Sequence, residues 1–375
     1  MKIAINLLFL RPGKVGGSEV FSRNLVENLL RIDKKNDYIL LVSENTKNEL
    51  VFNRKTEYLV CNFNNRSILK RVLFEQFVLP VTLRKKKIDV LINLGNTALL
   101  FSALKQVLVV HDLMYFVFPE YFSFLKRNYL RIMVWLSCRK AGRIATVSTH
   151  TKKDLVRFVK TDFKKITVIY AGVDEEKFSK AQQPAKVDHS DWHTFGRGDY
   201  VYSPTSIYPH KNNFSLIQAF AKLKKEREII HKLIITGVDP YNKKEALAGE
   251  IKQLEMENDI FYLGSVPFDH VPPIYHNAAV VVYLSEYEGF GLPVLEAMAA
   301  RVPVLSSNRS SLPEVVGNAG ILADPHDIHD VASKLHMLLT DTALRNQCIQ
   351  CGIKQVKRFS WEKTARKMID AYNEL

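Results

Sequence analysis

Cysteine and long hydrophobic runs are both scarce in this chain. Four cysteines in 375 residues are too few for a disulfide framework and favour a reducing compartment. No apolar run approaches the roughly 20 residues that span a bilayer, so we expect no integral membrane segment. The run from Ile3 to Leu10 is broken by Asn6 and has no small-residue cleavage site behind it, which indicates a first strand and not a signal peptide.

Clusters of metal ligands are lacking as well. Cys348 and Cys351 form a C-x-x-C pair, but no second pair or nearby histidine completes a zinc site. The motifs described below contain no acidic or histidine cluster at ligand spacing. We therefore expect no metal requirement and no cofactor.

Acidic residues are outnumbered, and the imbalance lies in one half of the chain. Residues 1–180 hold 32 Lys and Arg against 16 Asp and Glu, whereas the remainder holds 21 against 23, and the net charge is +14. A one-sided basic surface fits nucleic acid, an anionic membrane surface or a phosphorylated substrate. It is also compatible with a basic face that serves only solubility.

The length exceeds what one hydrophobic core usually holds, so two domains are expected. Strand-like runs alternate with helical segments, which indicates parallel α/β sheets. The runs are Ile3 to Leu10, Tyr38 to Val42, Val90 to Asn93, Val107 to His111, Arg143 to Val147, Ile166 to Ile169, Tyr200 to Ser203, Leu233 to Thr236, Ile260 to Leu263, Val280 to Leu284 and Val302 to Ser306. The polar stretch Ser179 to Gly198 is the natural linker. The pattern predicts two doubly wound domains facing each other across a cleft, with ligands beyond the carboxyl ends of the strands.

The stretch from Tyr287 to Val304, YEGFGLPVLEAMAARVPV, is the most informative part of the sequence. It follows the apolar, β-branched run Ala278 to Leu284, which is typical of a buried parallel strand. Gly289 and Gly291 let the backbone approach a ligand closely. Pro293 suits the first turn of a helix, whose free N–H groups and positive dipole end favour phosphate.

Two glutamates, Glu288 and Glu296, flank this turn with seven residues between them. A carboxylate one turn inside the helix, at Glu296, can accept two hydrogen bonds from a vicinal diol such as ribose. If the ligand is a nucleotide sugar, Glu288, on the loop, can reach hydroxyls of the sugar that lies beyond its diphosphate. A glutamate in a first turn can also merely balance the helix dipole. Downstream, Ser311 and Glu314 are spaced as a capping box that starts a helix and needs no function.

This stretch, together with its continuation from Ser306 to Asp324, resembles the donor-site signature of family 4 of the retaining glycosyltransferases, which have the GT-B fold. The resemblance spans nearly the whole chain. It implies a hexosyltransferase with an acceptor-binding Rossmann-like domain in residues 1–180 and a nucleotide-sugar-binding one in residues 199–358. It further implies that residues 359–375, including the last helix from Trp361 to Leu375, cross back to the first domain.

The resemblance also implies roles outside this stretch. Lys211, in a Pro-His-Lys-Asn loop, would face the donor diphosphate, and His111, in an HD motif, would contact the donor sugar near the reaction centre. Many members place an arginine near Ser206, so a second phosphate cation is missing here. The implied catalytic residues are His111, Lys211 and Glu288, and the implied donor contacts are Gly16, Gly17, Asp112, Ser206, Gly237, Gly264, Val266, Gly289, Phe290, Gly291, Leu292 and Glu296.

The segment through Phe118-Pro119-Glu120 and the Pro-His-Lys-Asn loop are most similar to those of mannosyltransferases. GDP-mannose is therefore the first-choice donor, with a UDP-sugar as the alternative, and a glycan or lipid-linked glycan is the implied acceptor. We favour retention by front-face departure and attack. A GT-B nucleotide-sugar epimerase and a basic nucleic-acid-binding protein stay open as alternatives, although no recognised nucleic-acid motif is present and we expect no nucleic-acid partner.

Two segments of the basic half, Ser67 to Lys87 and Tyr121 to Arg143, mix aromatic and aliphatic residues with Lys and Arg. Interfacial helices have this composition, and so do amphipathic helices packed on a sheet. Together with the positive excess, these segments predict a cytoplasmic protein that is peripheral on the inner face of an anionic membrane.

Overall fold

The computed structural model describes residues 1–11, 16–52, 56–63, 67–180 and 195–375, so most of the expected linker from Ser179 to Gly198 lies outside the described residues. The chain forms two compact units. The first comprises Met1–Gly172 and Ser360–Leu375, and the second comprises Val173–Phe359. Residues 173–180, which the sequence analysis placed in the first domain, therefore belong to the second unit. Their helix α7 (Glu175–Ser179) packs against α10 (Val271–Asn277) and α11 (Leu292–Ala299).

A seven-stranded parallel sheet forms the centre of the first unit, in the order β3-β2-β1-β4-β5-β6-β7. The strands are β1 (Lys2–Asn6), β2 (Asp37–Ser43), β3 (Glu57–Cys61), β4 (Val90–Asn93), β5 (Lys105–Val110), β6 (Arg143–Thr146) and β7 (Ile166–Val168). The order reverses between β1 and β4. In doubly wound sheets, ligands bind beyond the carboxyl ends of the strands at such a switch point.

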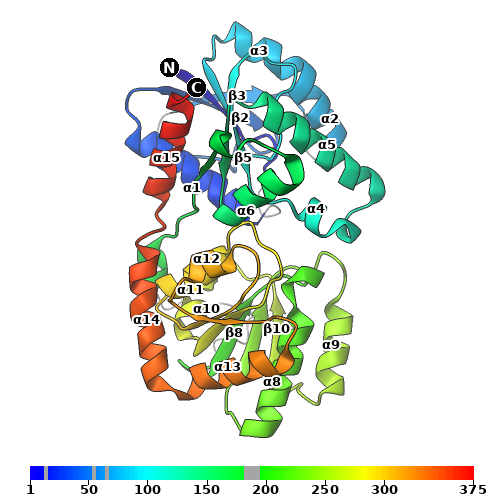
Figure 1. Ribbon diagram of the computed structural model, residues 1–375, viewed down its shortest axis with the longest axis vertical. Coiled ribbons are helices and arrows are strands. Elements are labelled where there is room, and N and C mark those ends of the chain that lie inside the picture. The colour runs from blue at the N-terminus through cyan, green and yellow to red at the C-terminus, as the bar shows by residue number, and fades with distance from the viewer. Residues whose placement is uncertain (12–15, 53–55, 64–66, 181–194) are drawn as a thin grey trace. The chain divides into compact units, whose positions relative to one another are not determined.

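Helices connect these strands (Figure 1). They are α1 (Gly17–Ile32), α2 (Ile68–Leu73), the π-helix η1 (Phe74–Val78), α3 (Leu79–Lys85), α4 (Met114–Val117), the 3₁₀-helix η2 (Pro119–Tyr121), α5 (Phe124–Lys140), α6 (Thr149–Asp154), the π-helix η3 (Leu155–Val159), the 3₁₀-helix η4 (Phe163–Lys165) and α15 (Trp361–Asn373). The sequence pattern does not reveal the two π-helical turns, because each continues an α-helix without a break.

The last helix, α15, belongs to the first unit, where it packs against α1. The Thr364 hydroxyl donates to the carbonyl of Tyr170 at 2.6 Å, and the Tyr372 hydroxyl donates to Asp33 Oδ2 at 2.6 Å. Tyr38 donates to the same carboxylate oxygen at 2.7 Å. Although burial alone would raise the pKa of Asp33, the hydrogen bonds from Tyr372, Asn36 and Tyr38 hold it well below its usual range. Asp33 is therefore an ionised anchor for α15.

The second unit repeats the architecture with a six-stranded parallel sheet in the order β10-β9-β8-β11-β12-β13. Its strands are β8 (Tyr200–Pro204), β9 (Lys232–Thr236), β10 (Ile260–Gly264), β11 (Val280–Tyr283), β12 (Val304–Ser307) and β13 (Ile321–Ala323). Besides α7, α10 and α11, its helices are η6 (Pro209–Lys211), α8 (Asn213–Arg227), α9 (Lys244–Gln253), η7 (Phe268–His270), α12 (Leu312–Val316), α13 (Ile328–Thr340) and α14 (Thr342–Val356). The order reverses between β8 and β11, where the site described below begins.

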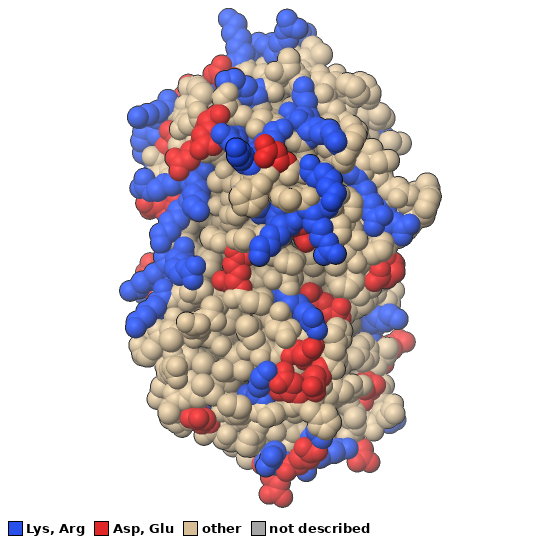
Figure 2. Space-filling model, in the orientation of Figure 1, with Lys and Arg blue, Asp and Glu red and all other residues tan. Residues whose placement is uncertain are grey.

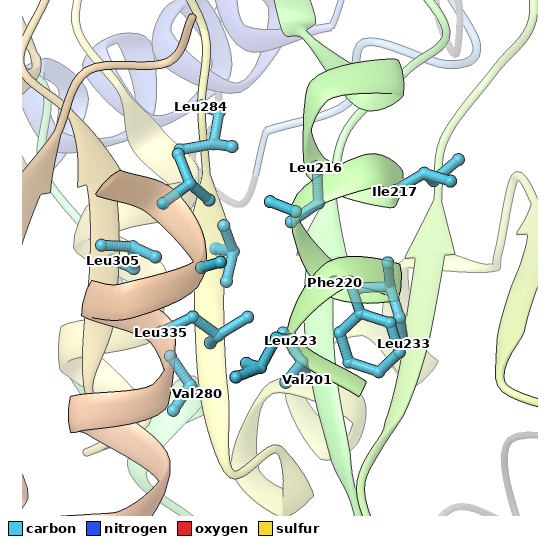
Figure 3. Packing of buried hydrophobic residues seen from close by; sticks show 14 of the residues in the cluster. Val201, Leu216, Ile217, Phe220, Leu223, Leu233, Val280, Leu284, Leu305 and Leu335 are labelled. Carbon is cyan, nitrogen blue, oxygen red and sulfur yellow. The ribbon is translucent and has the colours of Figure 1, made fainter. Parts of the chain in front are cut away.

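The core of the second unit lies between its sheet and helices α8 and α13 (Figure 3). Leu216, Phe220 and Leu223 of α8 pack against the strands, and Leu335 of α13 packs beside them. All four are fully or almost fully buried. Burial of each such side chain contributes about 1.5–3 kcal/mol, so the sheet that carries the site is held rigidly.

The expected fold class, α/β with two doubly wound Rossmann-like domains, is confirmed. Each predicted strand-like run coincides with an observed strand to within a few residues at its ends. Two strands were not predicted. Glu57–Cys61 (β3) is a half-exposed edge strand without a continuous apolar run, and Ile321–Ala323 (β13) has only three residues.

Candidate functional site

The loop between β11 and α11 lies at the carboxyl end of the second sheet, beside the strand-order reversal. Gly291, the N-cap of α11, has φ +117°, a backbone angle that residues other than glycine rarely adopt. A Cβ atom there would also lie 2.7 Å from Leu312 Cδ2. No side chain caps the helix, and Pro293 occupies its first turn. Pro293 has no N–H group, and the N–H groups of Val294 and Leu295 donate to the Gly291 carbonyl at 3.1 and 3.4 Å. What the start of α11 offers an anion is therefore the Leu292 N–H and the positive end of the helix dipole.

Lys211, Tyr283 and Glu288 form a compact polar cluster in this place. Lys211 ends η6, which follows β8, and its ammonium donates to Glu288 Oε1 in an ion pair. The Tyr283 hydroxyl accepts from Lys211 Nζ at 2.7 Å and donates to Glu288 Oε1 at 2.7 Å. Burial alone would raise the pKa of Glu288, but the Lys211 charge and the hydrogen bonds from Lys211 and Tyr283 outweigh it and hold that pKa below its ordinary value. Glu288 is thus ionised at neutral pH.

Two serines hold the backbone of the Glu288 loop. Ser310 Oγ accepts from the Glu288 N–H at 3.0 Å, and the Ser311 hydroxyl faces the carbonyls of Glu288 at 3.0 Å and Phe290 at 2.7 Å. Helix α12 starts after Ser311, as predicted, but the serine hydrogen bond of the predicted capping box with Glu314 is wrong, because Ser311 has helical backbone angles and its hydroxyl makes no cap hydrogen bond to α12. That hydroxyl is used instead to fix the loop that carries Glu288.

Glu296 occupies the second turn of α11, and its environment differs from that of Glu288. The hydroxyl of Tyr275, from α10, donates to Glu296 Oε2 at 2.8 Å. The Tyr275 ring is fully buried and packs edge-on against Tyr202 and Phe178. Burial raises the pKa of Glu296 to about 7, and the Tyr275 hydrogen bond offsets burial only in part. The two glutamates therefore differ in charge near neutral pH.

The structure also brings Ser206, Gly237 and Gly264 together at the ends of β8, β9 and β10. The Gly237 N–H donates to the Gly264 carbonyl at 2.8 Å, and a Cβ atom on Gly237 would lie 2.5 Å from the Ser206 nitrogen. The loops are thus packed backbone to backbone, which requires glycine at position 237. Val266 is half-buried and lies two residues beyond β10. These loops can present backbone groups to a flat ring.

Four of the predicted site residues lie in the first unit. Gly16 and Gly17 begin α1, whereas residues 13–15 of the same glycine loop lie outside the described residues. His111 Nε2 lies 2.9 Å from the Leu94 carbonyl, so this nitrogen carries the hydrogen because a carbonyl can only accept. Burial lowers the pKa of His111 to about 4, which keeps its ring neutral. Asp112 Oδ1 accepts from the Met114 N–H at 3.0 Å and so fixes the turn into α4.

The described part of the chain lacks both a cluster of metal ligands and a helix that could span a membrane. No group of three or more His, Cys, Asp or Glu side chains that could hold a metal ion occurs there. In the same residues, no helix is both long and apolar enough to cross a bilayer.

The second unit therefore assembles Lys211, Glu288 and Glu296 with the N-terminus of α11 at the carboxyl end of the sheet. This set offers a cation and the positive end of a helix dipole for a diphosphate, an ionised carboxylate for sugar hydroxyls, and a second carboxyl for a diol. Sequence reasoning missed the two tyrosines, Tyr275 and Tyr283, which orient the two glutamates. A tyrosine at the end of an otherwise aliphatic strand, as in VVVY, was the available signal for Tyr283.

Both halves of the chain match known protein families. Residues 15–177 match Glycosyltransferase Family 4, and residues 187–355 match Glycosyl transferases group 1. O-antigen chain mannosyltransferase B of Escherichia coli is 32% identical over 271 residues, covering 72% of this chain and 71% of that protein. O-antigen chain mannosyltransferase RfbU of Salmonella typhimurium is 28% identical over 277 residues, with the same shares of 72% and 71%.

Solved structures share the fold over the full length. Sucrose-phosphate synthase from Thermosynechococcus elongatus superposes with a TM-score of 0.80 at 17% identity, covering 100% of this chain and 98% of that one. HepE of Anabaena, solved in complex with UDP and glucose, gives a TM-score of 0.75 at 19% identity and covers 100% of both chains. At these identities the likeness shows the fold alone, which is the GT-B fold implied by the sequence resemblance.

Proposed function

Because the chain belongs to the group 1, or family 4, glycosyltransferases and is a hexosyltransferase, we propose that it transfers mannose from GDP-mannose to a glycan acceptor with retention of configuration. The observation that carries the proposal is the arrangement of Lys211, Glu288 and Glu296 at one end of the second sheet. The two O-antigen mannosyltransferases to which the chain is similar support mannose as the sugar.

In the proposed reaction, the donor diphosphate lies against Lys211 and the N-terminus of α11. The bond between sugar C1 and the phosphate oxygen breaks, and a bond between C1 and the acceptor oxygen forms on the same face. The acceptor proton passes to the departing phosphate oxygen. Lys211 and the helix end stabilise the negative charge that grows on the diphosphate, so we propose that no metal is required.

The remaining side chains position the donor in this proposal. Glu288 accepts hydrogen bonds from hydroxyls of the transferred sugar, and Glu296 accepts them from the ribose diol. Backbone groups near Ser206, Gly237 and Gly264 face the base. His111, neutral and with its Nδ1 able to accept a hydrogen bond, keeps the donor-sugar contact that the family resemblance implies.

A donor screen tests this function. GDP-mannose, GDP-fucose, UDP-glucose and UDP-GlcNAc are compared by thermal shift and by slow hydrolysis in the absence of acceptor. We expect GDP-mannose to give the largest shift and to release mannose and GDP. Preference for a UDP-sugar would contradict the donor assignment, and conversion of a UDP-sugar to its epimer without acceptor would favour the epimerase alternative.

The same hydrolysis assay tests the metal prediction. We expect the rate in excess EDTA to equal the rate without it, because Lys211 and α11 supply the positive charge. Loss of activity in EDTA that Mg²⁺ or Mn²⁺ restores would contradict this expectation.

Donor affinity should depend on pH through Glu296. The ribose diol donates to a carboxylate, so binding requires the ionised form of a group whose pKa burial raises to about 7. The apparent Kd for GDP-mannose should therefore fall about tenfold between pH 6 and pH 8. Isothermal titration calorimetry measures this. Glu296→Gln should bind more weakly at pH 8 and lose the pH dependence, whereas an unchanged slope in that variant would rule out Glu296 as the titrating group.

We further propose that the first unit docks on an anionic membrane, where a lipid-linked glycan acceptor would be met. Large apolar side chains are exposed along α2, η1, α3, α5 and the loop before β5, and we call them the amphipathic surface. They are Ile68, Leu69, Leu73, Phe77, Val78, Val81, Phe101, Phe124, Leu125, Tyr129, Ile132 and Trp135. Within the segment named in the sequence analysis, Leu79 and Leu83 are instead buried in the core.

Basic side chains accompany this surface. Lys85 and Lys87 at the end of α3 are exposed, whereas Lys86 lies 3.3 Å from Glu57 in an ion pair. On the face shown in Figure 2, Lys and Arg are dense over the first unit, and Asp and Glu are more frequent over the second. Apolar side chains that insert shallowly beside basic residues are typical of interfacial binding.

Reversing the charge of Lys85 and Lys87 should weaken binding to vesicles that contain phosphatidylglycerol by about tenfold or more, since each basic residue near such a surface contributes about 1 kcal/mol. Vesicle co-sedimentation measures the binding. The matched control is Lys225→Glu with Lys252→Glu, which makes the same charge change at exposed lysines of the second unit. Donor hydrolysis should be unchanged in both variants. Equal vesicle binding by the two variants would contradict docking through the amphipathic surface.

A further inference from the structure

Tyr283 is the last residue of β11, and only 2% of its surface is exposed. A buried hydroxyl needs hydrogen-bond partners, and other tyrosines of this sheet use uncharged groups. The Tyr202 hydroxyl lies 2.7 Å from Thr236 Oγ1. Tyr200 donates to the Ile274 carbonyl at 2.7 Å, and Tyr262 donates to the Gly237 carbonyl at 2.6 Å. The partners of Tyr283 are instead the Lys211 ammonium and the Glu288 carboxylate, each at 2.7 Å.

The structure pairs the two charges that the proposed reaction uses separately. Lys211 Nζ and Glu288 Oε1 neutralise each other as an ion pair. If Lys211 stabilises the diphosphate, its ammonium must turn partly or wholly from Glu288 to phosphate. A carboxylate that loses its counter-ion in a poorly hydrated place tends to take up a proton and to lose its orientation.

We propose that Tyr283 is a positioning residue of the donor site, whose hydroxyl holds Glu288 in place and ionised while Lys211 passes from Glu288 to the donor diphosphate. This inference rests on the proposed function and extends it to a residue that contacts neither sugar nor phosphate. The phenolic hydrogen stays on the Tyr283 oxygen and is donated in a hydrogen bond to Glu288 Oε1, because burial and the neighbouring Glu288 charge raise the pKa of Tyr283 well above its usual value. The hydroxyl can therefore donate to the carboxylate at any working pH.

The other groups around the cluster leave this role to Tyr283. His210 precedes Lys211, and burial followed by the Lys211 charge lowers its pKa to about 4, so His210 is neutral near pH 7. Glu296 acts on Tyr283 through its charge but makes its own hydrogen bond to Tyr275. The Glu288 main chain is held separately by Ser310 and Ser311. Loss of the Tyr283 hydroxyl should therefore move the side chain of Glu288 and leave its backbone in place.

Tyr283→Phe tests the inference, with Tyr200→Phe as the matched control. Each substitution removes one hydroxyl with a 2.7 Å hydrogen bond from a buried tyrosine of the same sheet. With GDP-mannose as the probe, we expect Tyr283→Phe to lower the kcat of donor hydrolysis at pH 7 by about 10- to 100-fold, with the donor KM changed by less than about threefold. The acid limb of its kcat profile should move to higher pH. Tyr200→Phe should keep wild-type kcat and acid limb.

Two outcomes would overturn the inference. One is a Tyr283→Phe enzyme with wild-type kcat and an unmoved acid limb. The other is an equal loss of kcat in Tyr200→Phe, because the effect would then be general loosening of the sheet.

A wild-type protein that neither binds nor hydrolyses any donor would refute the proposed function, and with it the passage of Lys211 to a diphosphate, but would leave the hold of Tyr283 on Glu288 to be tested. In that case, thermal unfolding of the two variants, measured at several pH values, tests whether Tyr283 holds Glu288 in place. Glu288 has a lowered folded-state pKa, so its stabilising effect is complete above its unfolded-state pKa and is lost as pH falls through the folded value. The loss of unfolding free energy caused by Tyr283→Phe should therefore be largest at pH 7 and decrease towards low pH. The loss caused by Tyr200→Phe should be the same at every pH. Parallel pH curves for the two variants would refute the positioning role.

Discussion

Glu288→Gln is expected to lower kcat for transfer and for donor hydrolysis by about 100- to 1000-fold, which is the usual effect of losing one preorganised electrostatic contact to a transition state. Glutamine keeps the size of the side chain but removes the charge that Lys211 and Tyr283 hold in place. Donor KM should stay the same or fall, because the released Lys211 is free to bind the diphosphate. Steady-state kinetics with GDP-mannose separate the two constants.

The control for this experiment is Glu286→Gln. Glu286 lies on the same loop, but its carboxylate faces His326 at 3.7 Å and takes no part in the cluster. We expect near wild-type kinetics from it. A Glu288→Gln enzyme with kcat within twofold of wild type would remove Glu288 from the reaction centre.

Lys211→Met is expected to reduce both activity and stability. Removing the cation should lower kcat/KM for the donor by about 1000-fold, in the range of other cation contacts to a departing phosphate. It also leaves the Glu288 carboxylate buried without its counter-ion, and breaking such a pair costs about 3–5 kcal/mol of unfolding free energy. Chemical denaturation and donor kinetics measure the two effects.

A double variant separates the two effects. Lys211→Met with Glu288→Gln has no unpaired charge, so it should regain most of the stability while its activity stays lost. Lys232→Met is the control for lysine removal, since its partner Asp259 also pairs with Lys224 at 3.0 Å. It should change stability by less than about 1 kcal/mol. A stable, active Lys211→Met enzyme would show that the pair is dispensable.

Much of the fold could be predicted because buried parallel strands have a strong pattern. The run Val280 to Leu284 is apolar and β-branched, and it was placed correctly, as was the helix that begins after Gly291. Strand Ile321–Ala323 (β13) was missed because three residues are too few to show a hydrophobic periodicity. The strand Glu57–Cys61 (β3) was missed because it lies at the sheet edge and its polar and apolar residues alternate little.

The residue types of the site could be predicted from the sequence, but the contacts between those residues could not. The sequence places Lys211 and Glu288 in separate loops, and only the folded sheet brings their charged atoms together across a span of 77 residues. Ser311 and Glu314 match a capping box locally, yet tertiary contacts give the Ser311 hydroxyl a different partner. The raised pKa of Glu296 depends on α10 packing over α11, which no local pattern encodes. Contacts between distant segments are what spacing alone leaves undetermined.

The return of α15 to the first unit has a consequence for biosynthesis. Domains generally fold as units, the amino-terminal one first, while the ribosome is still adding residues. Here the helix that covers α1 and supplies Tyr372 to Asp33 is translated only after all of the second unit. Until α15 has been added, the first unit lacks the side chains of Trp361, Met368 and Tyr372, which are buried in the folded protein. The first unit, although its strands precede those of the second unit in the chain, is therefore completed last, and a chaperone that shields its face against α15 would act after the second unit has been translated.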